Sequence, residues 1–415
     1  MTDRLDNPCQ VVVIGAGPAG LAAATTLKQN GISRVIVLER EPQGGGIPRH
    51  CGHPPFGMRE FGRIYSGPTY AKKLVDRARN AGVEIHTSTT VVEAGPGGRL
   101  LITSDRGPEE VTADRVIMAT GVRESPRSAR LISGSRPQGI VNTGALQSMI
   151  YLKNRKPFEH PVIIGSELVS FSAILTCRKA GIKPVAMLEE ADRVTARWPS
   201  ILLPRLAGIP LQLNTRLVRI EGNSQVTAIV VSDVTGRERR IDCDGVILSG
   251  GFVPEASLAR SGHLPVDALS NGPVVDQFGR CGDPAYFATG NLLRPVETAG
   301  WCWHEGRQVG HWVAQDLAGE LPDRNNELQI QIIDSLIKYS IPQKIALPDV
   351  SAGMSDLQLR FSRSAKGKLT VCNDRGIVWL KTLSVRPERR VLIPLKELTG
   401  ACGHGRLELN FNEIT

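Results

Sequence analysis

Residues 10–39 read QVVVIGAGPAGLAAATTLKQNGISRVIVLE, and this stretch decides the fold. Its apolar opening, Gln10 to Ile14, is typical of a strand buried inside a parallel sheet. Gly15–Gly20 follows as G-x-G-x-x-G, and the Ala- and Leu-rich segment after it predicts a helix. A second apolar strand, Val35 to Leu38, ends in Glu39. This order predicts a βαβ unit that binds a nucleotide.

Each part of this unit suits the ADP half of a dinucleotide. Gly15 permits the tight turn, Gly17 lets a pyrophosphate approach the backbone, and Gly20 lets helix and strand pack closely. The N-terminus of the helix offers free N–H groups and a positive dipole end to the phosphates. Glu39 stands about 20 residues further on, where its carboxylate can accept hydrogen bonds from a ribose. With all parts in register, an accidental glycine-rich loop is the weaker interpretation.

Two later segments extend this signal by resemblance. Ala113–Gly121 resembles the strand and Ala-Thr-Gly turn of flavoproteins with two dinucleotide-binding domains. Tyr286–Asn291 resembles their late flavin motif, with Asn291 in place of the usual Asp. A helix opened by Glu297–Gly300 and running through Leu317 would bring a second helix N-terminus near the flavin ring. The resemblance implies FAD, held from both ends of the chain, with the Asn291 amide able to bond the ribityl chain.

A second nucleotide motif is present but altered. Pro161–Ile164 predicts a buried strand, Gly165–Ser170 follows it, and a helix pattern then leads to a strand at Val185–Leu188. Glu167 stands where the second glycine belongs and Ser170 where the third does. A carboxylate at the pyrophosphate position both blocks close approach and repels phosphate. We therefore favour a retained fold without nicotinamide over a degraded NAD(P)H site that still binds a ligand.

The loop Ile47–Met58 contains an unusual group of reactive side chains: His50, Cys51 and His53. In a flavoprotein of this layout, the loop passes beside the isoalloxazine, so these side chains are candidates for handling protons or charge. The alternative is a rigid loop whose imidazoles bond backbone groups. A metal site lacks a fourth ligand at suitable spacing. The nearby Trp301–Glu305 segment could wall the flavin ring, although core packing is the favoured interpretation.

Bulk composition limits the remaining possibilities. The 415 residues predict two or three domains, and the formal charge of +9 is spread along the chain. Nucleic-acid binding is a weak interpretation, because no basic tract is interleaved with aromatics. The eight cysteines are scattered without C-x-x-C spacing, which argues against a disulfide framework and against bound metal. No apolar run suits a membrane span, and the polar Met1–Pro8 is no signal peptide, so we expect a cytoplasmic protein.

These motifs together resemble the FAD-binding subunits of hydrogen cyanide synthase, opine oxidase and dye-linked proline or hydroxyproline dehydrogenases. The likeness covers about the first 320 residues and rests on Gly15–Gly20, Gly45–Gly52, Ala119–Glu124 and the segments Gly290-Asn291 and Val296–Gly300. It implies electron transfer through flavin beside a second flavoprotein subunit. Several relatives carry a four-cysteine [2Fe–2S] module, but only Cys372 and Cys402 follow Cys302 in this chain, too few for such a cluster.

The tail after about residue 320 has no recognised motif. Its periodicity predicts a short helix over Ile330–Tyr339 and then a small β-rich domain. The expected strands are Leu357–Phe361, Lys368–Cys372, Ile377–Leu383, Arg390–Leu392 and Arg406–Phe411. Docking a partner, covering the flavin and capping the core are all open as its role.

The expected fold class is α/β: a Rossmann-like FAD-binding domain (1–124 and 245–319), an inserted NAD(P)-type domain with a degenerate motif (125–244) and a β-rich C-terminal domain (320–415). The expected cofactor is FAD, with NAD(P) disfavoured and no metal. Cys51 and His53 are the catalytic candidates. The expected cofactor-binding residues are Gly15, Gly17, Pro18, Ala19, Gly20, Glu39, Arg40, Gly45, Gly46, Ile47, His50, Val91, Ala119, Thr120, Gly121, Gly290, Asn291 and Thr298.

The leading functional hypothesis is an FAD-dependent dehydrogenase component acting on an amino acid, amine, opine or related small metabolite. Its expected partner is a second flavoprotein subunit or another copy of the chain, without nucleic acid. One alternative is a flavin-holding electron-transfer subunit without its own substrate site. Another is a self-sufficient NAD(P)H-dependent flavin reductase.

Overall fold

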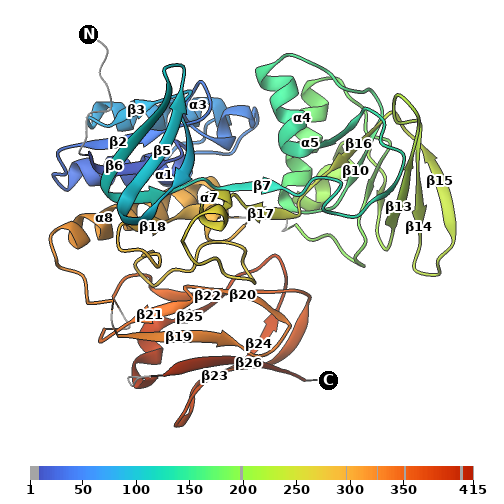
Figure 1. The fold of residues 1–415 in the computed structure, drawn as a ribbon. Coiled ribbons are helices and arrows are strands. Elements are labelled where there is room, and N and C mark those ends of the chain that lie inside the picture. Colours follow the sequence, from blue (N-terminus) through green and yellow to red (C-terminus); the bar gives the residue numbers. More distant parts are fainter. Residues whose placement is uncertain are drawn as a thin grey trace.

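The computed structural model describes residues 9–196, 200–295, 297–324, 326–349, 352–401 and 405–414. The chain forms three units: a helix-packed sheet, a second α/β unit joined to it by a two-stranded ribbon, and a β-rich C-terminal unit (Figure 1). Met1–Pro8, Val296 and Cys402 lie outside the described residues. The expected fold class is confirmed.

The first unit is built around one long strand that pairs twice. The second half of β6 (Gly107–Met118) runs parallel to β1 and β18, whereas its first half is antiparallel to β5. The parallel part has the order β3-β2-β1-β6-β18, and β6-β5-β4 is a meander. The other strands are β1 (Cys9–Ile14), β2 (Val35–Leu38), β3 (Glu84–His86), β4 (Thr90–Ala94), β5 (Arg99–Ser104) and β18 (Tyr286–Ala288).

Helices from distant parts of the sequence complete this unit. They are α1 (Pro18–Gln29), α2 (Met58–Phe61), α3 (Gly67–Asn80), α7 (Ser257–Ser261), α8 (Ala299–Leu317) and the short 3-10 turns η1 (Ile47–His50), η2 (Pro96–Gly98) and η5 (Gly290–Leu292). The expected strand at Val35–Leu38 and the expected end of α8 at Leu317 are confirmed.

Helices α1 and α8 cross at backbone contact. A Cβ placed on Gly306 would lie 2.0 Å from the carbonyl oxygen of Ala19, and one on Gly310 would lie 2.6 Å from that of Ala23. Real Cβ atoms cannot approach this closely, so the four-residue glycine spacing on α8 is a steric requirement of this crossing. This crossing joins the N-terminal segment of the first unit to the segment that returns late in the chain.

The chain passes from the first unit into the central unit along β7 (Val122–Glu124) and returns along β17 (Phe252–Pro254). These two strands form an antiparallel ribbon (Figure 1). The parallel sheet of the central unit has the order β12-β11-β10-β16-β9, and a second sheet has the order β15-β14-β13-β8. The strands are β8 (Ser133–Gly134), β9 (Ile140–Asn142), β10 (Pro161–Ile164), β11 (Ala186–Leu188), β12 (Leu211–Gln212), β13 (Arg216–Glu221), β14 (Ala228–Ser232), β15 (Glu238–Asp242) and β16 (Gly245–Leu248).

The helices of the central unit are α4 (Thr143–Gln147), η3 (Ser148–Leu152, a π turn), α5 (Leu168–Lys179), η4 (Ser200–Leu202) and α6 (Leu203–Leu206). Since β16 starts at Gly245 and pairs with both β10 and β9, the chain is still inside this unit at the residue where we expected it to return. We therefore propose that the insertion extends to about residue 251.

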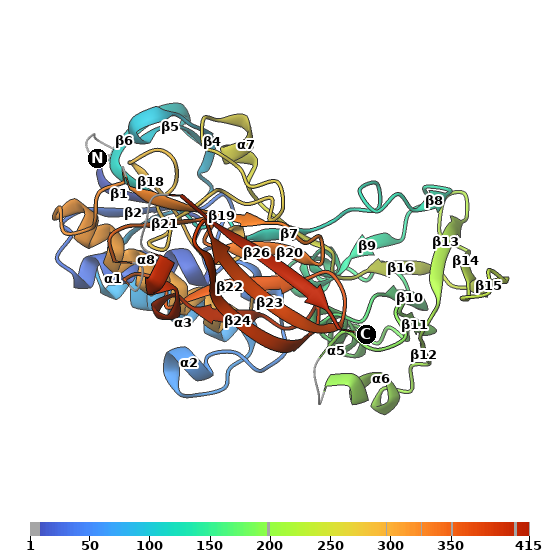
Figure 2. The same cartoon turned by 90° about the horizontal axis from the view of Figure 1, so that it is seen from below.

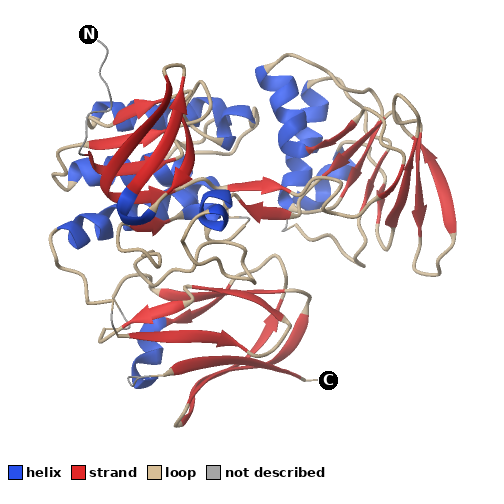
Figure 3. Ribbon diagram, in the orientation of Figure 1, coloured by secondary structure: helices blue, strands red, loops and turns tan. Residues whose placement is uncertain are grey.

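The regular secondary structure described for the C-terminal unit consists of strands and one short helical turn (Figure 3). It contains a five-stranded sheet, β21-β19-β26-β23-β24, and a three-stranded sheet, β20-β22-β25. The strands are β19 (Glu327–Ile332), β20 (Ile337–Ile341), β21 (Lys344–Ala346), β22 (Asp356–Phe361), β23 (Ala365–Asn373), β24 (Gly376–Val385), β25 (Val391–Pro394) and β26 (Arg406–Glu413), with one 3-10 turn, η6 (Leu395–Ala401).

The helix expected over Ile330–Tyr339 is wrong. The segment ends β19, turns, and begins β20. The turn is closed by Asp334, whose side chain accepts a hydrogen bond from the Leu336 backbone at 2.7 Å and whose carbonyl accepts one from Ile337 at 3.1 Å. Apolar residues on both sides of this turn imitate a helical period. The local turn chemistry of Asp therefore overrides the pattern.

The three units are not joined in the same way. Buried apolar residues of the C-terminal unit, such as Leu357 and Phe361, belong to the same continuous core as β1 and α1. The central unit has two cores of its own, one around Phe171 and one around Ile229. Among the described residues, no buried apolar cluster therefore extends from the central unit into its neighbours.

We predict that Gly306→Ala lowers the free energy of unfolding by about 1–3 kcal/mol, because the added methyl group overpacks the α1–α8 crossing. Gly144→Ala is the matched control within a helix, since its Cβ would meet only a Glu124 oxygen, at 3.5 Å. Thermal unfolding of both variants followed by circular dichroism measures the difference. Equal melting of Gly306→Ala and wild type would contradict this account of the crossing.

Candidate functional site

The glycine-rich turn lies at the carboxyl ends of three parallel strands. Gly15 N donates to Leu38 O at 2.8 Å, and Ala119 N donates to Ile14 O at 2.9 Å. This edge of an open α/β sheet is where ligands bind.

The second and third glycines of the turn serve different purposes. A Cβ on Gly20 would lie 2.0 Å from Gly15 O, so the third glycine is needed for packing of the protein itself. A Cβ on Gly17 would meet no described atom within 4 Å, so the second glycine is not needed for packing of the protein itself. The open space at Gly17 lies beside the N-terminus of α1, which Pro18 begins and Ala19 continues. This is the arrangement that a pyrophosphate requires.

Glu39 is buried at the end of β2 and holds the turn. Its carboxylate accepts hydrogen bonds from Ala16 N and from Glu41 N, both at 2.9 Å. Each oxygen keeps acceptor capacity for a ribose. The neighbouring candidates differ: Arg40 and Ile47 are exposed, and Val91 is buried in β4.

The Gly44–Gly46 run presses against the same turn. Gly45 N donates to Ala16 O at 2.7 Å, and a Cβ on Gly46 would come within 2.8 Å of the Gly17 Cα. The run leads into η1, where His50 Nδ1 is buried without a hydrogen-bond partner in the described part of the chain. Burial, followed by the charge of Arg49, lowers the pKa of His50, so its imidazole is neutral at physiological pH.

The late segment closes the site from the other end of the chain. Gly290 lies against Ala19, since a Cβ there would come within 2.8 Å of the Ala19 Cβ. The Thr289 hydroxyl is buried and has no partner among the described residues. The Asn291 side chain is already used: it accepts from Glu297 N at 2.8 Å and donates to Glu297 O at 3.0 Å. An Asp could not make the second of these bonds, so the replacement fixes the loop before α8.

Two further candidate residues, Thr120 and Thr298, form hydrogen bonds close to the glycine-rich turn. Thr120 Oγ1 donates to Glu255 O at 2.7 Å, which ties the Ala119–Gly121 turn to the strand returning from the central unit. Thr298 is the N-cap residue of α8, and its carbonyl accepts from the backbone of Trp301 and Cys302, both at 3.0 Å. The cradle at Gly17, the acid at Glu39 and the unpartnered Thr289 and His50 atoms together fit FAD.

Cys51 and His53 face the central unit through a directional hydrogen-bond chain. Cys51 Sγ donates to Gln147 Oε1 at 3.5 Å, and Gln147 Nε2 donates to Ser172 Oγ at 2.7 Å. The Ser172 hydroxyl is left to donate to His53 Nε2, so His53 carries its proton on Nδ1, which bonds Pro54 O at 2.9 Å. This chain joins the Ile47–Met58 loop to α4 and α5.

The Cys51 side chain is poorly suited to act as a thiolate. Burial raises its pKa to about 12, so it is a protonated thiol near neutral pH. The neighbouring Gly52 is covered by the Tyr151 ring, whose Cε1 would lie 2.0 Å from a Cβ there. The geometry therefore favours a fixed interdomain contact for Cys51. It leaves His53, which is half-buried, as the more accessible of the two catalytic candidates.

The second motif has the backbone of the first but a different side chain in the phosphate position. Gly165 N bonds Leu188 O at 2.8 Å, as Gly15 N bonds Leu38 O, and Glu167 has the extended backbone found at Gly17. The Glu167 carboxylate accepts from Gly251 N at 3.1 Å and touches Gly250. Ser170 fills the third position and donates to Ser249 Oγ at 2.9 Å. An internal carboxylate thus stands where a pyrophosphate would bind.

The ribose end of this second site is also engaged. Glu189, the counterpart of Glu39, accepts hydrogen bonds from Ser166 Oγ and, at 3.0 Å, from Ala191 N. Arg193 follows in the same loop and pairs with Glu388 of the C-terminal unit at 3.0 Å and with Ser364 at 2.9 Å. Arg193 and Ser362 also line a hollow of about 350 Å³ between these units.

Sequence reasoning missed Gln147, Ser172, Arg193 and Glu388. None belongs to a motif, and each finds its partner only through tertiary contact: Cys51 and Gln147 are 96 residues apart. The one signal available was the polar character of Gln147, Ser172 and Thr176 within otherwise apolar helices, which indicates satisfied buried groups.

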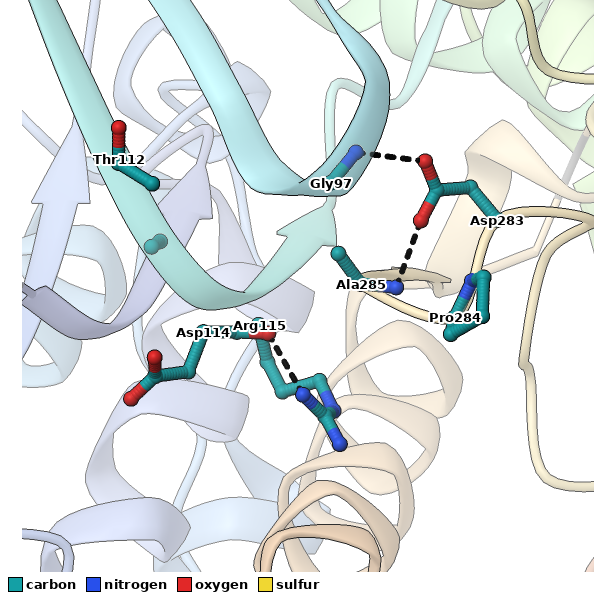
Figure 4. Close-up of a pocket in the computed structure, with 8 residues that line it drawn as sticks. Gly97, Thr112, Asp114, Arg115, Asp283, Pro284 and Ala285 are labelled. Atoms are coloured by element: carbon teal, nitrogen blue, oxygen red, sulfur yellow. Dashed lines mark hydrogen bonds between the residues drawn. The ribbon is translucent and has the colours of Figure 1, made fainter.

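A second hollow lies elsewhere. It measures about 520 Å³ and is lined by the start of the parallel part of β6 and by Asp283–Ala285 (Figure 4). The Asp283 carboxylate there accepts from Gly97 N and Ala285 N, both at 2.8 Å. Because this hollow adjoins the amino end of β18, it is separate from the glycine-rich edge. Within the described residues, no helix is both long and apolar enough to cross a bilayer.

We predict that Gly17→Ala weakens FAD binding at least tenfold, about 1.4 kcal/mol, while leaving the melting temperature of the FAD-free chain unchanged. The added methyl group would meet no described protein atom, only the space assigned to the pyrophosphate. Flavin titration followed by fluorescence quenching measures the affinity. Gly20→Ala is the contrast, since it should destabilise the protein itself. Unaltered FAD affinity in Gly17→Ala would remove the pyrophosphate from this turn.

We predict that iodoacetamide at pH 8 leaves Cys51 unlabelled in the folded protein, because a pKa of about 12 leaves roughly one thiolate in ten thousand. Peptide mass spectrometry before and after denaturation measures the labelling. The half-buried Cys372 serves as the internal reference. Rapid labelling of Cys51 in the native chain would show that the thiol is accessible and activated.

Comparison with known proteins identifies relatives of this chain. An opine oxidase subunit of Rhizobium meliloti (strain 1021) is 24% identical over 60% of this chain and 58% of its own length, which confirms the resemblance to that group. The biphenyl dioxygenase system ferredoxin–NAD(+) reductase component of Paraburkholderia xenovorans (strain LB400) is 27% identical over 72% of this chain and 69% of its own length.

The fold is shared with the crystal structure of T. acidophilum thioredoxin reductase, with a TM-score of 0.63 and 22% identity over 74% of this chain and 98% of that one. Residues 9–308 match the family described as pyridine nucleotide-disulphide oxidoreductase. That match takes in both glycine-rich motifs, the connecting ribbon and the start of α8. The protein therefore belongs to the pyridine nucleotide-disulphide oxidoreductase family and is an FAD-dependent oxidoreductase.

Proposed function

We propose that this chain is the FAD-holding component of a dehydrogenase that oxidises a small metabolite of the amino-acid, amine or opine type and does not take electrons from NAD(P)H. The observation that carries the proposal is the hydrogen bond from Gly251 N to the Glu167 carboxylate. It fills the second dinucleotide site with a group of the chain itself.

Charge and shape both act against a nicotinamide dinucleotide. A carboxylate about 4 Å from a phosphate charge costs between about 1 kcal/mol in water and about 4 kcal/mol near a protein surface. Glu167 is half-buried, so the cost falls within this range. At the second site, the Glu167 side chain also occupies the position that corresponds to the open space beside Gly17 at the first site. The first site is therefore proposed to hold the one dinucleotide of the chain.

The residues of the first site are proposed to orient the flavin. The α1 N-terminus holds the phosphates, Glu39 the ribose, and Thr289 and His50 offer polar atoms toward the rest of the cofactor. When bound, FAD supplies hydride or electron transfer between substrate and acceptor. His53 is the proposed proton-handling residue, because its Nε2 lies in a hydrogen-bond chain with Ser172 and its imidazole is half-buried. Cys51 is proposed to position the loop.

A partner is part of this proposal. The opine oxidase relative is named as a subunit, and this chain spans 58% of its length. We propose a second flavoprotein subunit, or a second copy of the chain, as the component that completes the substrate site. A flavin-holding subunit without its own substrate site remains an alternative, which a substrate panel on the isolated chain would distinguish.

A second candidate function is an NAD(P)H-dependent reductase. It is favoured by the name of the ferredoxin–NAD(+) reductase relative and by the preserved βαβ backbone around Gly165. In that case Glu167 would have to leave Gly251 when the nucleotide binds.

We predict that neither NADH nor NADPH bleaches the flavin of the wild-type protein at a substantial rate. Glu167→Gly combined with Ser170→Gly restores G-x-G-x-x-G at residues 165–170 and should raise the rate with NADH about 100-fold or more. NADPH should respond less, because Glu189 repels a ribose phosphate. Anaerobic stopped-flow absorbance measures the bleaching, and retained FAD with unchanged circular dichroism confirms folding.

Glu167→Gln is the matched control. Its amide oxygen can still accept from Gly251 N, so the phosphate position stays filled and NADH should gain little. Fast bleaching of the wild-type flavin by either nucleotide would overturn the proposed function in favour of the reductase.

A further inference from the structure

We propose that the surface formed by α2, the loop after it and the first half of α8 docks an acidic redox protein that exchanges electrons with the flavin. This surface, called the α2 face, consists of Met58, Arg59, Arg63, Ile64, Trp301 and Arg307. The proposal rests on the proposed function only in requiring that the first site hold FAD. It assigns the place and the chemistry of a partner.

The α2 face carries positive charge that the chain does not neutralise. Arg59, Arg63 and Arg307 are exposed, and none forms an ion pair with another described residue. The acid of α2, Glu60, is buried, accepts from the Tyr70 hydroxyl at 2.5 Å, and forms no ion pair with these arginines. Lys72 and Lys73 extend the charge onto α3, beside the exposed acid Asp76.

Some arginines elsewhere on the surface are paired with acids. On the central unit, Arg219 pairs with Glu238 at 2.8 Å, and Arg240 pairs with Glu221 at 3.1 Å. On the C-terminal unit, Arg363 pairs with Glu413 at 2.8 Å. The charge of these three arginines is balanced locally, whereas Arg59, Arg63 and Arg307 stand together on the α2 face without a described ion pair.

The centre of the α2 face is apolar, and its tryptophan is in contact with two arginines. Met58 is 59% exposed and Ile64 is 58% exposed, both large side chains in contact with water. Trp301 is stacked with two guanidinium groups, Arg59 at 4.2 Å and Arg390 at 4.4 Å from the ring centroid. Aromatic and arginine side chains of this kind are enriched in protein interfaces, and fixing them in advance reduces the entropy lost on docking.

The position of the face connects it to the flavin. Trp301 is in the first turn of α8, whose N-terminal end follows the Gly290–Glu297 loop of the FAD site. Arg59 lies directly on Gly300, since a Cβ there would come within 2.8 Å of Arg59 Cδ. In Figure 2, α2 projects from the body of the protein. A protein bound here would sit beside the end of the site where the ring is expected.

Charge complementarity selects the occupant. A basic rim around an apolar centre fits a protein with an acidic rim, whose approach it accelerates through the long-range field. Nucleic acid is the weaker fit, because the described aromatic of this face is clamped between arginines instead of being free to stack on bases.

The test uses an acidic plant-type [2Fe–2S] ferredoxin as the probe and the full, FAD-loaded chain. Chemically reduced ferredoxin is mixed with the oxidised flavoprotein, and flavin bleaching gives a second-order rate constant, with the dissociation constant from calorimetry. Between about 0.01 M and 0.15 M salt the rate constant should fall and the dissociation constant should rise, as the Debye length falls from about 30 Å to 8 Å. Arg63→Glu with Arg307→Glu should lower the rate constant and raise the dissociation constant, each about tenfold or more.

Arg237→Glu with Arg375→Glu is the matched control, since both arginines are exposed on other units and the change in net charge is the same. It should leave the rate within about twofold of wild type. Equal losses in both variants, salt-independent binding, or preferential binding to phosphatidylserine-containing vesicles or DNA would each overturn the proposal. Dithionite separates the two failures: a flavin that dithionite bleaches but ferredoxin does not reach rejects the docking alone, and a chain that holds no FAD rejects the proposed function.

Discussion

The crossing of α1 and α8 is the constraint on which the site depends. The candidate FAD site combines the N-terminus of α1 with the residues around Gly290, which come late in the chain and lie against Ala19 at the same edge of the sheet. Gly306 and Gly310 allow this by bringing α8 onto the backbone of α1, with no room for a side chain. The core of the C-terminal unit is continuous with this pair, so its packing supports the same geometry.

The two glycine-rich turns separate the role of backbone from that of side chains. Both turns end a parallel strand with the same backbone hydrogen bond, and both begin a helix. At Gly17 the chain leaves the helix N-terminus open, whereas at Glu167 it supplies its own anion to a neighbouring N–H. A fold that binds dinucleotides can thus be kept while one residue changes what its site accepts.

Sequence reasoning succeeded where local chemistry is sufficient. The buried strands Val35–Leu38 and Pro161–Ile164 are bounded as expected, because continuous apolar runs between polar turns leave little alternative. It failed at Ile330–Tyr339, where an Asp turn divides two strands whose apolar residues imitate a helix. It could not find the Cys51–Gln147–Ser172–His53 chain, since hydrogen-bond partners this far apart in sequence are set by tertiary packing.

The C-terminal unit lies mostly beyond the family match at residues 9–308, yet it contacts both other units at charged positions. Arg360 pairs with Glu297 at 2.8 Å, in the loop that Asn291 holds before α8, and Glu388 pairs with Arg193 beside the second motif. A partly buried pair such as Arg360–Glu297 is costly to break singly, because the remaining charge would be left without its partner. Through these two contacts, the C-terminal unit links the loop before α8 to the central unit. The family match therefore covers both nucleotide motifs, whereas residues outside the matched range link the loop before α8 to the central unit.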